Sequence, residues 1–108
     1  MTIALFLFAI AAAGGLLIAR MRFQGKPYPP MGLALVHGAV AAAGLLTLIA
    51  VVAQGQTTGA TGPLVLFIIA ALGGFGLFFH HLRKVPLPKW LVVVHALVAV
   101  IAFLMLLF

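Results

Sequence analysis

Residues 30–53, PMGLALVHGAVAAAGLLTLIAVVA, form one apolar stretch without a single charged side chain. About 20 apolar residues in a helix are enough to cross the roughly 30 Å hydrocarbon core of a bilayer. Residues 2–19, 63–82 and 88–108 are similar apolar stretches, and Lys89, at the start of the last, is the one Lys or Arg among them. In lipid only helices and closed barrels satisfy every backbone polar group, and these continuous runs lack the alternation of barrel strands. The sequence therefore predicts an all-α integral membrane protein, a four-helix transmembrane bundle that has the lipid bilayer as its solvent.

The composition supports this prediction and removes several kinds of chemistry. Of the 108 residues, 67% are hydrophobic and only 6% are charged, whereas a soluble domain keeps about a quarter of its residues charged. The chain has no Asp, no Glu and no Cys. Carboxylate acids and bases, Ser-His-Asp triads and thiolate catalysis are therefore excluded.

All six cations lie in two connectors, and the third connector, residues 54–62, is neutral. The positive-inside rule then predicts that both basic connectors face the cytoplasm and that both termini lie outside, in what we expect to be a bacterial cytoplasmic membrane. Because topology accounts for all six charges, we expect no nucleic acid partner. The cations are Arg20, Arg22, Lys26, Arg83, Lys84 and Lys89.

The two halves of the chain resemble each other, which predicts a single transmembrane domain made of two tandem-duplicated helical hairpins. We place the first repeat at residues 1–53, the outer loop at 54–62 and the second repeat at 63–108. The motif LALVHGAVA in the first matches LVVVHALVA in the second, so His37 matches His95. Both follow a proline by seven residues, which puts them at equal depth, about 10 Å below the cytoplasmic edge.

Two imidazoles at equal depth on symmetry-related helices are suited to hold a b-type haem, with His37 and His95 as its metal ligands. Small residues on and beside these helices leave volume for a flat macrocycle, and nearby cations suit its propionates. Interhelical hydrogen bonding, another metal or a proton role are alternatives for the same pair. The predicted cofactor-binding residues are His37, His95, Gly15, Gly74, Ala41, Ala99, Arg20, Arg22, Lys26, Arg83 and Lys84.

Two further histidines end the third apolar stretch. His80 and His81 lie where histidine complements the negative end of a helix in the headgroup region. His80 also shares a helix face with two glycines, so either residue is an alternative metal ligand. Trp90 and Tyr28 fit the aromatic belt at the membrane interface.

With these features the chain resembles the four-helix membrane-bound b-type cytochromes. The resemblance covers the architecture of the whole chain and implies non-covalent haem b, axial ligation by His37 and His95, and electron transfer. Such cytochromes often carry a second histidine pair near the opposite membrane face. Here the outer halves of the helices contain no histidine, so any redox work is expected at the cytoplasmic side.

Two other functions compete with this one. The first is a cofactor-free accessory subunit that packs against a larger membrane complex through its Gly and Ala faces. The second is a small transporter, in which a histidine would have to replace the missing intramembrane carboxylate. We expect a haem-binding or electron-transfer protein rather than an independent enzyme, with a membrane or redox protein partner and a homodimeric state as open expectations.

Overall fold

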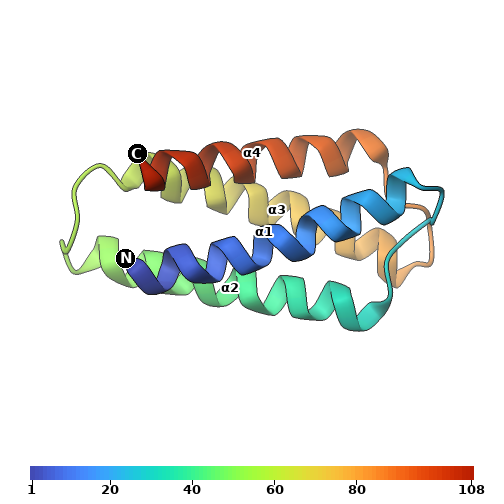
Figure 1. Cartoon of the computed structure of the whole chain (residues 1–108), viewed down its shortest axis with the longest axis horizontal. Helices are drawn as coiled ribbons and strands as arrows, with labels where there is room; N and C mark the ends of the chain where they lie inside the picture. Colours follow the sequence, from blue (N-terminus) through green and yellow to red (C-terminus); the bar gives the residue numbers. More distant parts are fainter.

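The computed structural model describes all 108 residues and contains four α-helices and no strands (Figure 1). The predicted four-helix, all-α fold is thereby confirmed. All four helices are long and apolar enough to cross a membrane, and we describe the chain as an integral membrane protein. The helices are α1 (Thr2–Phe23), α2 (Met31–Ala53), α3 (Thr61–Leu82) and α4 (Lys89–Leu107).

The helix ends follow the sequence signals closely, with two differences. Helix α3 begins at Thr61, two residues before the predicted start, because a proline is tolerated in the first turn of a helix, and this shortens the predicted outer loop. Helix α1 continues through Phe23, four residues beyond the predicted end at Ala19, because Arg20 and Arg22 are good helix formers that carry their charges outward on long stems. Gly25, at φ +103°, then turns the chain into the first connector. Helix α2 begins directly after the proline at position 30, which lacks the N–H that a preceding helical turn would need.

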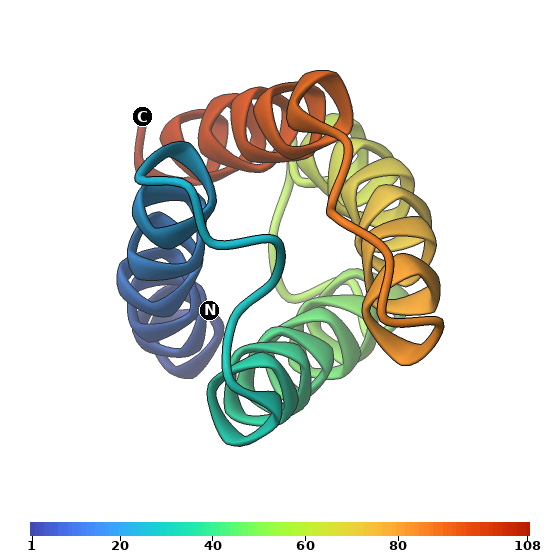
Figure 2. The same cartoon turned by 90° about the vertical axis from the view of Figure 1, so that its right-hand side faces the viewer.

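The helices run up and down in order around a ring, so that each packs against its neighbours in sequence and α1 also packs against α4 (Figure 2). Helices α1 and α3 lie on one diagonal of the ring, and α2 and α4 lie on the other. The bundle measures 43 × 22 × 19 Å. We call the end with the connectors 24–30 and 83–88 the basic end, and the end with both termini and the connector 54–60 the neutral end.

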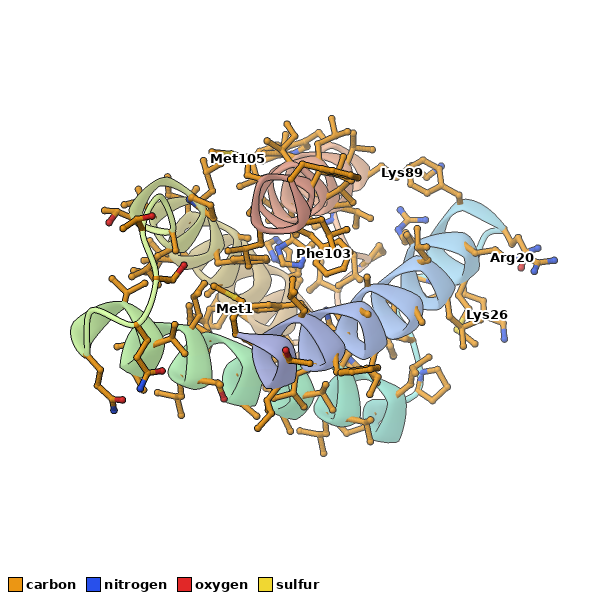
Figure 3. The ribbon with its side chains drawn as sticks, turned by 60° about the vertical axis from the view of Figure 1, so that its left-hand side comes forward. Met1, Arg20, Lys26, Lys89, Phe103 and Met105 are labelled. Carbon is orange, nitrogen blue, oxygen red and sulfur yellow. The ribbon has the colours of Figure 1, made fainter.

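Figure 3 shows the division of charge between the two ends, with Arg20, Lys26 and Lys89 at one and Met1 and Met105 at the other. No acidic side chain offsets the cations anywhere in the chain. The basic end therefore carries the whole net charge of +6.

The hydrophobic core lies in the half of the bundle near the neutral end. Phe8 of α1 and Phe67 of α3 stack across the diagonal, with ring centroids 3.9 Å apart and planes within 2°. Gly44 of α2 makes room for this stack, since a Cβ there would lie 3.1 Å from the Phe8 ring. Ala4 and Leu48 complete the core and are fully buried. This half is therefore closed by the chain's own side chains.

The outer surface of the helices is apolar. Large hydrophobic side chains on all four helices are exposed, including Phe6, Leu46, Leu72 and Leu97. Such a surface is stable only in contact with lipid or with another apolar surface. Contact with the lipid bilayer, as predicted, follows from this surface.

Candidate functional site

His37 lies on α2 and reaches across to α1 within the first hairpin. Its Nδ1 lies 2.8 Å from the carbonyl oxygen of Ala11. The ring packs on the glycine pair of α1: a Cβ on Gly15 would lie 2.9 Å from its Cε1, and one on Gly14 would lie 3.7 Å from its Cβ. Any side chain at position 15 would therefore push the imidazole out of its place.

His95 repeats this arrangement in the second hairpin. Its Nδ1 lies 2.7 Å from the carbonyl oxygen of Ala70 on α3. A Cβ on Gly74 would lie 3.2 Å from its Cε1, and a Cβ on Gly73 would lie 3.6 Å from its Nδ1. The contacts in the two hairpins match one for one. The reason is that the alanine and the glycine pair have the same spacing on α1 as on α3.

The two imidazoles, one from α2 and one from α4, lie close to each other in the bundle. Their ring centroids are 6.3 Å apart and their planes are nearly perpendicular, at 83°. A carbonyl only accepts hydrogen bonds, so Nδ1 carries the proton in each ring and donates it to the neighbouring helix. Each Nε2 makes no hydrogen bond within the chain. The structure thus brings His37 and His95 together as two imidazoles whose Nδ1 atoms are bonded to the protein and whose Nε2 atoms are not.

The small residues around the pair were predicted to leave volume for a flat macrocycle, and the structure gives them more specific roles. The space above Gly15 and Gly74 is taken by the imidazole rings themselves, so these glycines position the histidines rather than leaving volume for a macrocycle. Ala41 and Ala99 lie one turn beyond the histidines, toward the neutral end, and are half-buried. The alanine carbonyls that orient the rings were not predicted. Their signal was present in the matched IAAAGG and IAALGG motifs, since each lies three residues before a glycine pair.

The predicted alternative ligands do not join the pair. The Nδ1 of His80 donates to the carbonyl of Gly76, one turn back on its own helix, at 2.7 Å. His81 is buried, at 6% exposure, and its ring stacks on Tyr28 at a centroid distance of 5.0 Å. Tyr28 therefore packs inward against the bundle instead of joining the interfacial belt, whereas Trp90 is exposed as expected.

The cations fall into two groups. Only Arg22 is half-buried, and its Nε donates to the carbonyl of Leu87 at 2.8 Å. In Figure 3 the side chains of Arg20 and Lys26 point away from the helices. Arg83 lies over the ring of Phe79, 5.5 Å from its centroid. The exposed cations are Arg20, Lys26, Arg83, Lys84 and Lys89.

At the basic end the two connectors close over the bundle. The N–H of Leu87 donates to the carbonyl of Pro27 at 2.9 Å, which ties one connector to the other. Arg22 of α1 bonds to the second connector, and His81 of α3 stacks on the first. We call Arg22, Pro27, Tyr28, His81 and Leu87 the cap. No sequence motif marked it, because every contact joins residues far apart in the chain.

Burial is uneven along the bundle. Between the cap and the histidine pair, Val92 is the only buried side chain on the four helices. On α1 no residue after Ala11 is buried, and on α2 none before Gly44. The half of the bundle near the neutral end thus contains most of the buried side chains of the helices.

No protein-family model, curated protein or solved structure matches this chain. Its function is therefore inferred from its own residues and their geometry.

Proposed function

We propose that this chain is a membrane haem b protein, in which His37 and His95 are the two axial ligands and electron transfer is the activity. The observation that carries the proposal is the close pair of imidazoles on diagonal helices, 6.3 Å apart and each held by a hydrogen bond from Nδ1 to a backbone carbonyl. Metal-ligating histidines nearly always use their second nitrogen in this way, which fixes the tautomer and the ring orientation.

The spacing of the rings supports axial ligation. Metal–nitrogen bonds of about 2 Å on either side of an iron, with about 1 Å from each nitrogen to its ring centre, separate the ring centres by about 6 Å. The observed separation is 6.3 Å. The rings therefore need almost no movement along the line that joins them.

The donor set favours haem over a bare metal ion. A structural zinc site takes four protein ligands and a catalytic one takes three, whereas no group of three potential ligand side chains gathers anywhere in the chain. Two imidazoles suit a metal that brings its remaining ligands with it, as the iron of haem does with its four pyrrole nitrogens.

The chain's own residues would do three things in this function. His37 and His95 hold the group, and the carbonyls of Ala11 and Ala70 keep a proton on each Nδ1 and fix the orientation of each ring. The Phe8–Phe67 stack holds the helices together on the neutral side of the histidine pair. When bound, haem supplies one-electron redox chemistry. By the positive-inside rule the basic end faces the cytoplasm, and we propose electron exchange at that side.

The experiment is a pair of absorbance spectra, oxidised and dithionite-reduced, of protein purified in detergent after expression with supplied haem. We expect a six-coordinate low-spin spectrum whose Soret band sharpens and shifts on reduction, with a 1:1 haem content in a pyridine haemochrome assay. His37→Ala and His95→Ala should each abolish that spectrum. His80→Ala is the matched control, because this histidine bonds only to its own helix, and it should leave the spectrum unchanged.

A wild-type protein that stays colourless would overturn the proposal. The two histidines would then serve only as hydrogen-bond donors between helices, and a cofactor-free accessory subunit would be the better interpretation. A coloured protein whose spectrum survives both alanine substitutions would show that the ligands are other residues.

A further inference from the structure

Arg22 and His81 occupy equivalent positions in the two hairpins. Arg22 lies seven residues beyond Gly15 on α1, and His81 lies seven residues beyond Gly74 on α3. Seven residues of helix rise about 10 Å. Both side chains therefore lie at the same height above the imidazole pair, at the basic end of the bundle.

These two residues differ from the other basic residues by their burial and their contacts. Arg22 is half-buried, and because its Nε is bonded to the Leu87 carbonyl, the guanidinium is fixed while its Nη donors have no acceptor in the chain. His81 is held between Tyr28 and Phe78, with ring centroids at 5.0 and 6.0 Å, and its nitrogens make no hydrogen bond within the chain. Every Lys and every other Arg is exposed.

The chain has no carboxylate that could accept hydrogen bonds from these donors. The sequence contains no Asp and no Glu, and the terminal carboxylate of Phe108 lies at the neutral end. A guanidinium is always charged and an imidazole always carries at least one N–H, so both side chains can donate to a carboxylate, and hydrogen bonds to charged groups are among the strongest in proteins. A ligand that brings carboxylates to the cap would supply such an acceptor.

The positions of the two histidines indicate where such carboxylates would lie. His37 and His95 come from α2 and α4, the helices of one diagonal of the ring, and their rings bond to α1 and α3, the helices of the other diagonal (Figure 2). A group held between the two rings therefore lies next to α1 and α3 as well. Arg22 and His81 lie on α1 and α3, one at each end of that second diagonal.

We propose that Arg22 and His81 bind the two propionate carboxylates of the haem, one each. The proposal rests on the proposed function and narrows it, since it selects one of the predicted cations and adds a residue first considered as an alternative metal ligand. Both propionates leave the same edge of a haem, and this edge then faces the cap. Charge-assisted hydrogen bonds of about 2.8 Å would join the two carboxylates to Arg22 and His81.

The test compares binding of haem with binding of haem dimethyl ester, in which both carboxylates are masked, to detergent-purified apoprotein. Charge-assisted hydrogen bonds contribute enough for wild-type protein to bind haem about tenfold or more tightly than the ester. Arg22→Met keeps the length of the stem and removes its donors. His81→Phe keeps a ring to stack on Tyr28. Each should reduce the preference for haem several-fold, and the double variant should lose it.

Arg20→Met and His80→Phe are the matched controls, one or two positions away on the same helices, and should keep the wild-type preference. Arg22→Lys retains a cation and should keep most of it. The preference is a ratio within each variant, so a general loss of stability does not change it. An unchanged preference in both Arg22→Met and His81→Phe would overturn the inference and leave the haem proposal standing. Failure of wild-type protein to bind either compound would overturn both.

Discussion

Alanine substitutions in the two glycine pairs test the packing of the imidazoles directly. Gly15→Ala would place a Cβ 2.9 Å from the Cε1 of His37, well inside the 3.5–4.0 Å at which carbon atoms pack. The ring cannot swing away freely, because its Nδ1 is bonded to a carbonyl of α1. Gly14→Ala, one position earlier, would place its Cβ at an ordinary 3.7 Å from the same residue.

Gly14→Ala and Gly15→Ala both gain stability from the higher helix propensity of alanine, but only Gly15→Ala loses stability through overpacking. Replacing a helical glycine with alanine stabilises a helix by about 0.5–1 kcal/mol. Overpacking of a filled site costs about 1–3 kcal/mol. We therefore expect Gly14→Ala to be neutral or stabilising, and Gly15→Ala to be less stable than Gly14→Ala by about 1–3 kcal/mol in free energy of unfolding. Gly74→Ala, with a contact of 3.2 Å, should fall between them.

The assay is unfolding of the apoprotein in mixed micelles with increasing sodium dodecyl sulfate, followed by circular dichroism and by the fluorescence of Trp90, the only tryptophan. Haem affinity of the same variants gives a second measure, because Gly15→Ala also displaces a proposed ligand. Equal stabilities of Gly14→Ala and Gly15→Ala would refute the close packing of His37 on α1.

Three further predictions concern other parts of the molecule. Phe8→Ala should lower the free energy of unfolding by about 3–5 kcal/mol, because it removes a stacked ring from the core, and Gly44→Ala should be better tolerated in that background than in wild type, as a double-mutant cycle would measure. Leu87→Ala should cost about 2 kcal/mol or more, since this side chain is 3% exposed within the cap, and the same titration measures it. Because the chain has no cysteine, single cysteines introduced at Gln56 and Lys84 can be labelled with impermeant maleimide in intact cells, where the proposed topology predicts labelling of the first only.

The helices and their order could be predicted from the sequence because they depend on local properties. Length, hydropathy and the absence of charge determine a membrane helix, and a proline before α2 and a glycine after α1 mark their ends. The sequence predicts an earlier end for α1, because two arginines directly after an apolar stretch are typical of a connector. In a helix their long stems can carry the charge to the aqueous boundary without ending it.

The candidate site was only partly predictable. The repeated motif brought His37 and His95 to matching positions, since a rare polar residue stands out in an apolar sequence. The hydrogen-bond partners of these histidines could not be predicted, because Ala11 and Ala70 accept through backbone carbonyls, which every residue has. The role of His81 was also hidden, since its contact with Tyr28 depends on how the two connectors cross.

The central claim, that His37 and His95 ligate one haem iron, is tested most directly by low-temperature electron paramagnetic resonance of the oxidised, haem-loaded protein. The near-perpendicular imidazole planes, at 83°, predict a strongly anisotropic low-spin ferric signal with one large g value. The signal should be lost in either His37→Ala or His95→Ala and kept in His80→Ala. A high-spin signal in wild-type protein, or a low-spin signal that persists without either histidine, would contradict the account.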